Sequence, residues 1–142
     1  MKSTLLKTGI AGLLFAASIT LIQCSNGSAQ GFRTVSVQTA DSLRQNDSSV
    51  IILDVRTREE YSSETGHLPK AQLIPVQELE SRIDELAPYK NKTIITYCRT
   101  GRRSETAAAI LSKNGYSVLN MQGGIASWND AHLPVEQLQQ PK

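Results

Sequence analysis

Residues 93–104 read Thr-Ile-Ile-Thr-Tyr-Cys-Arg-Thr-Gly-Arg-Arg-Ser, so an apolar run passes directly into a loop rich in cations. The run over residues 93–97 has the pattern of a strand that is buried on both faces. The same pattern occurs at residues 50–55, Val-Ile-Ile-Leu-Asp-Val, and more weakly at residues 117–121 and 34–37. These four runs are the expected strands.

Helical spacing of apolar residues fills the gaps between the expected strands. A short helix is expected over residues 39–45, and longer helices over residues 76–86 and 107–113. Pro88 would stop the second of these helices and Gly115 the third. Strands that alternate with helices predict an α/β fold: a parallel β-sheet of about five strands, flanked by helices.

The first 29 residues have the organisation of an export signal peptide. Lys2 and Lys7 precede a nearly unbroken apolar run over residues 10–22, and a small polar segment follows it. An apolar run of this length is too short to span a bilayer comfortably. We therefore expect an exported, periplasmic protein.

Two ways of processing this signal remain open. Small residues before Gln30 favour cleavage after Ala29, whereas Cys24 directly after the apolar run resembles the lipidation site of a bacterial lipoprotein. Membrane attachment is expected only if Cys24 is lipidated. In either case one domain is expected over residues 30–137. Residues 138–142 form a tail, with fraying expected from residue 134.

Composition and charge limit the function classes. Hydrophobic residues make up 39% of the chain and charged residues 20%, which fits a folded domain and argues against a disordered or disulfide-dense chain. The formal charge of +2 comes entirely from Lys2 and Lys7, so the expected domain is neutral. A neutral domain offers no bulk field for nucleic acid, which is not expected as a partner.

Cys98 is the one cysteine left in the domain once Cys24 is removed or lipidated. Its loop enters a helix, whose N-terminal amides and dipole favour an anion, and Gly101 permits the curl that turns successive amides inward. Three arginines stand within five residues of the same loop, Arg99, Arg102 and Arg103. We expect an exposed thiol whose pKa lies below its ordinary value, a nucleophile that also binds anions.

Three ordered motifs resemble those of the single-domain rhodanese family of sulfurtransferases, over roughly residues 34–137. The motif at the cysteine, residues 98–104, resembles the active-site loop of the family. The other two motifs are Asp54-Val55-Arg56 with Glu60-Tyr61, Gly66-His67-Leu68, Ala71 and Ile74-Pro75, and Gly123-Gly124 with Trp128 and Leu133-Pro134-Val135. Two departures fall within the motif that begins at Asp54: four residues separate Tyr61 from Gly66, and Lys70 stands where glycine is common.

The resemblance implies a thiosulfate sulfurtransferase-like enzyme that works through a persulfide. The Cys98 thiolate would take the outer sulfur of a small anionic donor such as thiosulfate, and cyanide, a thiol or a protein thiol would accept it. No metal and no organic cofactor is implied. The loop residues implied in substrate binding are Arg99, Thr100, Gly101, Arg102, Arg103 and Ser104.

Asp54, Arg56 and His67 are expected to support the site. Asp54 either takes part in catalysis or bonds loop amides or Arg56 and so holds the shape of the site. His67 is either a general base or a turn histidine whose ring satisfies backbone groups. Trp128 is expected to pack the last helix, and the remaining acidic residues are expected to form a solvated surface.

Two alternative functions stay open at this point. One is an exported sulfur-carrier or redox interaction module with little turnover alone, since a carrier needs the same persulfide. The other is a cysteine-dependent phosphatase. Such phosphatases place an arginine six residues after the cysteine, where this chain has Ser104 and carries Arg103 one position earlier.

Overall fold

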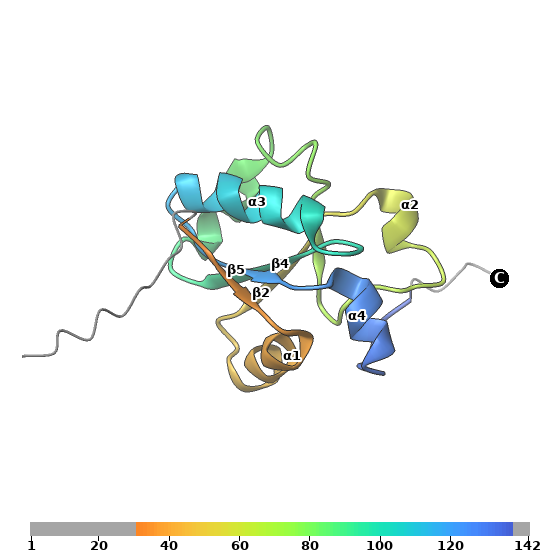
Figure 1. The fold of residues 1–142 in the computed structure, drawn as a ribbon. Coiled ribbons are helices and arrows are strands. Elements are labelled where there is room, and N and C mark those ends of the chain that lie inside the picture. The colour runs from red at the N-terminus through yellow and green to blue at the C-terminus, as the bar shows by residue number, and fades with distance from the viewer. Residues whose placement is uncertain (1–30, 138–142) are drawn as a thin grey trace, which may run out of the picture.

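The computed structural model describes residues 31–137; the expected signal and tail lie outside the described residues (Figure 1). No helix within the described part of the chain is long and apolar enough to cross a membrane. The elements in chain order are β1 Arg33–Val35, α1 Val37–Asn46, β2 Ile51–Asp54, α2 Arg58–Tyr61, β3 Gln72–Leu73, the 3₁₀ helix η1 Ile83–Tyr89, β4 Thr93–Tyr97, α3 Arg102–Lys113, β5 Ser117–Met121 and α4 Gly124–Asp130.

The five strands form one parallel sheet in the order β1-β5-β4-β2-β3, which confirms the predicted fold class. Asp54 at the end of β2 lies beside Tyr97 at the end of β4. Thr96 of β4 lies beside Asn120 of β5. The carboxyl ends of the central strands therefore meet at one edge of the sheet, where ligands of open parallel sheets bind.

Helices cover both faces of the sheet: α3 and η1 lie on one face, and α1 and α4 on the other (Figure 1). Side chains of β4 alternate between the two layers. Ile94 and Cys98 belong to the apolar cluster that contains Leu111 of α3. Ile95 belongs to the cluster that contains Trp128 of α4.

The predicted strands over residues 93–97 and 117–121 have the bounds observed for β4 and β5. The first strand is shorter than predicted because α1 already begins at Val37. Ser36 caps this helix by accepting a hydrogen bond from the N–H of Thr39 at 3.2 Å. Helix α1 thus begins two residues before the start predicted from apolar spacing.

The α-helix predicted over residues 76–86 is wrong. The chain runs through turns into η1, which contains Pro88 instead of ending before it. The N–H of Glu85 bonds the carbonyl three residues before it, on Arg82, at 3.0 Å. Leu79 and Leu86 are buried all the same. Apolar residues spaced three and four apart fit tight three-residue turns as well as an α-helix, so the pattern predicted the buried face and not the helix type.

The prediction that the chain frays from residue 134 is also wrong for residues 134–137, the part of this segment that the structure describes. Glu136 and His67 form an antiparallel bridge, with N–H to carbonyl distances of 2.9 Å and 2.8 Å in the two directions. The indole N–H of Trp128 donates to the carbonyl of Pro134 at 3.0 Å. Residues 134–137 are therefore held on the domain by hydrogen bonds to their main-chain atoms, which leave no periodic pattern in the sequence.

The two departures from the family motif lie in surface turns. Residues 62, 64 and 65 are exposed, so the extra length between Tyr61 and Gly66 extends into solvent. Lys70 is exposed and has a φ of 61°. That left-handed conformation is the one that favours glycine, which explains why glycine is common at this position.

Candidate active site

Cys98 follows β4 directly and lies at the carboxyl edge of the sheet, three residues before the glycine that precedes α3. Only 1% of the Cys98 surface is exposed, so the sequence-based prediction of an exposed thiol is wrong. The alternation of β4 explains the burial, because it turns the Cys98 side chain toward the α3 layer.

The sulfur of Cys98 is held by hydrogen-bond donors of its own loop. The N–H of Gly101 donates to Sγ at 3.1 Å. Gly101 has a φ of 111°, a conformation that a side chain would oppose, and it caps α3. Burial alone would raise the pKa of Cys98, but the amide and hydroxyl of Ser104 and the amides of Gly101 and Thr100 outweigh it and lower the pKa.

Helix α4 fixes the same loop from its other side. The N–H of Ile125 donates to the carbonyl of Cys98 at 2.9 Å, and the N–H of Ala126 donates to the carbonyl of Arg99 at 3.0 Å. A Cβ on Gly124 would lie 2.3 Å from the carbonyl oxygen of Cys98, so only glycine permits this approach. With the carbonyls held by α4, the loop amides are free to face the sulfur.

Ser104 connects the loop to β5 through a residue that the sequence reasoning missed. Its buried hydroxyl lies 2.7 Å from Oδ1 of Asn120 and 2.9 Å from the carbonyl oxygen of Gly101. Asn120 is itself buried. A polar residue inside the predicted apolar strand 117–121 was the available signal, because a buried amide needs a partner.

Replacing Ser104 with alanine should raise the pKa of Cys98, because the Ser104 hydroxyl favours the thiolate. The rate of alkylation by iodoacetamide against pH should shift to higher pH. Thr106→Ala is the matched control, since its hydroxyl bonds the carbonyl of Arg102 on the exposed side of α3. An unchanged profile in Ser104→Ala would show that the amides alone stabilise the thiolate.

The three loop arginines have different environments. Arg103 forms a bidentate ion pair with Glu60 of α2, at 2.6 Å and 2.7 Å. Arg99 and Arg102 are exposed and form no ion pair with other described residues. The expectation that the remaining acidic residues are simply solvated is thus wrong for Glu60. Its carboxylate pairs with Arg103, which lies 43 positions later in the chain.

The hydrogen bonds from Arg103 hold the pKa of Glu60 at about 2, against an ordinary value of 4.5. A carboxylate with a lowered pKa in the folded state stabilises the fold above its unfolded pKa, and this contribution is lost as the pH falls through the folded pKa. The melting temperatures of the wild type and Glu60→Gln should therefore converge as the pH falls from about 5 to about 2. A constant difference across that range, measured by circular dichroism, would contradict the assignment.

A cavity of about 400 Å³ borders the loop and is lined by Arg99, Arg56, Glu60 and Ile125, among others. A second cavity of about 500 Å³ is lined by other residues of the loop, among them Thr100, Gly101 and Arg102. Each of the two cavities thus borders the loop that follows Cys98 and is lined by one of its exposed arginines.

Asp54 and Arg56 form a buried pair beneath the first cavity. The carboxylate of Asp54 accepts hydrogen bonds from the guanidinium of Arg56 at 2.6–3.0 Å and from the hydroxyl of Tyr97 at 2.5 Å. Arg56 also donates to the carbonyl of Gly66 at 2.8 Å. Both carboxylate oxygens of Asp54 therefore have partners, on Arg56 and on Tyr97 of β4, and Arg56 in turn bonds the turn at Gly66.

His67 is engaged in the same turn. Its Nδ1 lies 3.3 Å from the carbonyl oxygen of Tyr61 and must donate, since a carbonyl only accepts. Its ring stacks on that of Tyr61 at a centroid distance of 3.9 Å. Trp128 is fully buried in the α4 layer. The His67 ring thus bonds a backbone carbonyl, and the Trp128 side chain packs α4 against the sheet.

The sequence profile of the family described as "Rhodanese-like domain" matches residues 36–131. A putative sulfur carrier protein of Bacillus subtilis, YrkF, is 37% identical over 105 residues, which cover 73% of this chain. The chain spans only 55% of the length of that relative.

Two further similarities agree with this match. The thiosulfate sulfurtransferase PspE of Escherichia coli is 41% identical over 73 residues, which cover 51% of this chain and 68% of PspE. The crystal structure of a rhodanese-like domain protein from Staphylococcus aureus superposes with a TM-score of 0.64 at 27% identity, covering 75% of this chain and all of that one.

Proposed function

Because the chain belongs to the rhodanese-like family, we propose that it is a sulfurtransferase that carries sulfane sulfur as a persulfide on Cys98. The proposal rests on the environment of the Cys98 sulfur. This sulfur lies at the carboxyl edge of the sheet and accepts a hydrogen bond from the N–H of Gly101 at 3.1 Å, and the pKa of the Cys98 thiol is lowered. Such a thiolate is the reactive form of cysteine in covalent catalysis.

In the first step the Cys98 thiolate attacks the outer sulfur of thiosulfate. The new S–S bond forms on Cys98 while the bond to the sulfonate sulfur breaks, and sulfite leaves with the bonding electron pair. In the second step an acceptor thiolate attacks the outer persulfide sulfur, and the Cys98 thiolate leaves. The loop amides that face Sγ would stabilise the negative charge of the persulfide.

Thiosulfate suits the charges around the loop. Arg99 and Arg102 are exposed, form no ion pair with other described residues, and each lines one of the two cavities that border the loop after Cys98. A dianionic donor gains charge-assisted hydrogen bonds from such groups. Only its outer sulfur has to reach the buried Sγ, and the name of the Escherichia coli relative supports the same donor.

Steady-state kinetics separate a catalyst from a carrier. We expect thiosulfate and cyanide to give the parallel double-reciprocal lines of a ping-pong reaction. Turnover that appears only with a reduced protein dithiol in place of cyanide would identify a carrier, the function that the name of the Bacillus subtilis relative suggests. Intersecting lines would contradict the persulfide intermediate.

A phosphatase activity is disfavoured by the loop. Arg103 stands one position earlier than a phosphatase loop requires, and its guanidinium already forms two hydrogen bonds with Glu60. The position that a phosphatase gives to arginine is held by Ser104, which is buried. Hydrolysis of p-nitrophenyl phosphate that depends on Cys98 would reverse this conclusion.

We also propose that residues 1–29 direct export. The support is the arrangement of Lys2, Lys7 and the apolar run over residues 10–22. Mass spectrometry of the protein from its native host should show a chain that starts at Gln30 or at an acylated Cys24. Cytoplasmic protein that keeps Met1 would overturn the proposal.

A further inference from the structure

We infer that the second cavity is a binding site of its own, for a small molecule that carries an α-amino acid group. Asn120 and Arg102 bind the carboxylate of this ligand, and Glu105 binds its ammonium group. The site goes beyond the proposed sulfur transfer. Among the described residues, the two cavities that border the loop have no lining residue in common.

The second cavity lies where the sheet ends at its edge strand, β1. Thr34 of β1 and Thr96 of β4 are the neighbours of Asn120 in register across the sheet. Val118, two residues before Asn120, packs in the apolar cluster that contains Leu111 of α3. Because side chains alternate along a strand, Asn120 faces the same layer. The row of polar side chains at this level of the sheet therefore points toward the α3 side.

Asn120 is buried, but only one end of its amide is used. Its Oδ1 accepts the hydroxyl of Ser104 at 2.7 Å. Its Nδ2 has no hydrogen-bond partner among the residues that the structure describes, although Asn120 is only 5% exposed. In the same part of the chain, every side-chain nitrogen or oxygen that is sealed from solvent does have a partner. The Nδ2 group therefore opens into the cavity that Asn120 lines, as a donor without an acceptor.

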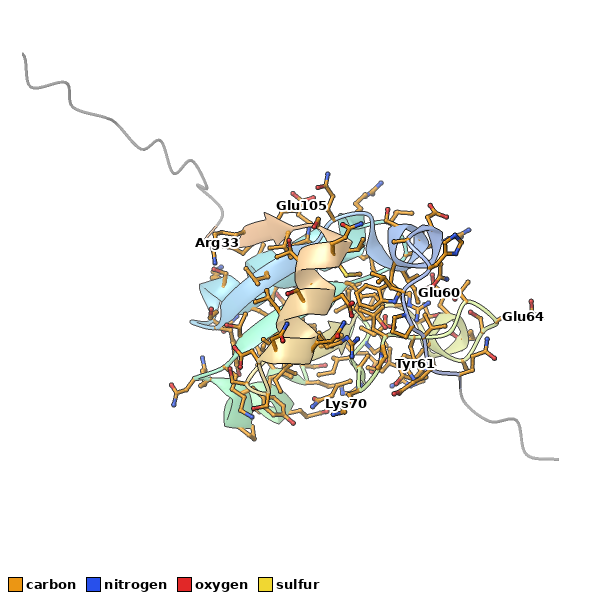
Figure 2. The ribbon with its side chains drawn as sticks, turned by 90° about the horizontal axis from the view of Figure 1, so that it is seen from below. Arg33, Glu60, Tyr61, Glu64, Lys70 and Glu105 are labelled. Carbon is orange, nitrogen blue, oxygen red and sulfur yellow. The ribbon has the colours of Figure 1, made fainter. Side chains whose placement is uncertain are left out.

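Two charged residues of α3 line the same cavity. Arg102 and Glu105 are exposed, and neither forms an ion pair with any described residue. Figure 2 shows Glu105 beside the arrow of β1, whereas Glu60, which lines the first cavity, lies toward the opposite end of the molecule. The second cavity thus offers a guanidinium and an amide donor, with a carboxylate one helical turn away.

This set of groups matches an α-amino acid group. An arginine binds a carboxylate through two parallel N–H groups, and Nδ2 of Asn120 supplies a further donor. A ligand with a carboxylate alone would bring a like charge toward Glu105, whereas an ammonium group on the neighbouring carbon would attract it. A volume of about 500 Å³ lies within the range of small-molecule sites. The combination therefore favours a zwitterion over a simple anion or a simple amine.

The test compares three probes with the same carbon skeleton, titrated into the full chain and followed by the backbone amide signals of α3 in NMR spectra. L-Alanine carries both charged groups, propionate lacks the ammonium group, and ethylammonium lacks the carboxylate. L-Alanine should bind at least roughly tenfold more tightly than either of the others, because each of them loses one charge-assisted interaction. All titrations are made at the same ionic strength.

Variants assign each charged group of the ligand to its partner. Arg102→Ala should weaken the binding of L-alanine and propionate but not that of ethylammonium. Glu105→Gln should weaken the binding of L-alanine and ethylammonium but not that of propionate. Arg99→Ala removes an exposed arginine that lines the first cavity, so this matched control should leave the affinity for L-alanine unchanged.

A third variant tests the buried donor. Asn120→Asp keeps an oxygen for the hydroxyl of Ser104 but replaces the free Nδ2 group with a second oxygen. It should weaken the binding of L-alanine by roughly tenfold or more. Because Asn120 is buried, thermal unfolding is measured on this variant as well. The two exposed substitutions, Arg102→Ala and Glu105→Gln, carry the test if this variant does not fold.

Three results would overturn the inference. The first is no binding of L-alanine, or equal affinities for the three probes. The second is an affinity for L-alanine that Arg102→Ala and Glu105→Gln leave unchanged. The third is displacement of L-alanine by thiosulfate from Cys98→Ser, which would assign the cavity to the sulfur donor. None of these measurements needs sulfur transfer, so a failure of the proposed function leaves the test intact, and a failure here leaves the persulfide on Cys98 untouched.

Discussion

Replacing Cys98 with serine should abolish sulfur transfer from thiosulfate, lowering kcat by more than about a thousandfold. A serine hydroxyl stays protonated at neutral pH and cannot release a sulfur as the thiolate does. The side chain is nearly the same size, and its neighbour Gly101 can donate to oxygen as well as to sulfur. We therefore expect the variant to fold, which thermal unfolding followed by circular dichroism would verify.

Cys24→Ser is the matched control for this prediction, since Cys24 is the other cysteine of the chain. It should keep the turnover of the wild type. If Cys98→Ser retained turnover while Cys24→Ser lost it, the nucleophile would be in the expected signal segment, and the site described above would not be catalytic.

Replacing Gly124 with alanine should destabilise the domain by about 3 kcal/mol or more, through backbone strain and overpacking together. Its φ is 59°, and a Cβ would lie 2.3 Å from the carbonyl oxygen of Cys98 and 2.6 Å from the carbonyl carbon of Arg99. These are main-chain atoms, so no rotamer change can relieve the contact. Relief requires α4 to move away from the loop, which would lower sulfur transfer as well as stability.

Gly115→Ala is the control for the backbone part of this effect. Gly115 also has a positive φ, 78°, but its nearest neighbour would be Nζ of Lys90 at 3.6 Å, an ordinary contact. It should cost only about 1–2 kcal/mol, the price of the left-handed conformation. Urea unfolding of the two variants measures the difference, and equal losses would show that the approach of α4 to the loop is not tight.

The sheet could be predicted because its central strands are long enough to carry a pattern. Residues 93–97 and 117–121 are buried on both faces, and burial of this kind leaves a continuous apolar run in the sequence. The two residues of β3 and the four residues of α2 cover about one repeat of a strand or helix pattern, which is too little to show that the pattern recurs. The turns over residues 76–82 and the start of η1 keep the apolar spacing of an α-helix, so this spacing alone predicts an α-helix there.

The cysteine loop could be predicted because its residues are adjacent in the chain. The partner of Arg103 could not, because Glu60 lies on another element and meets it only once the sheet has formed. Asn120 is a similar case, since its bond to Ser104 joins β5 to α3. The sequence also led us to expect an exposed thiol, because position in a loop says nothing about the layer toward which β4 turns its last side chain.

Whether Cys98 carries the transferred sulfur can be read from the intact mass of the Cys24→Ser protein after incubation with thiosulfate and no acceptor. We predict a gain of about 32 Da, one sulfur atom, which is located at Cys98 by peptide fragmentation and lost again on adding a thiol. A protein whose mass stays unchanged after thiosulfate, while its Cys98 still reacts with iodoacetamide, would contradict it.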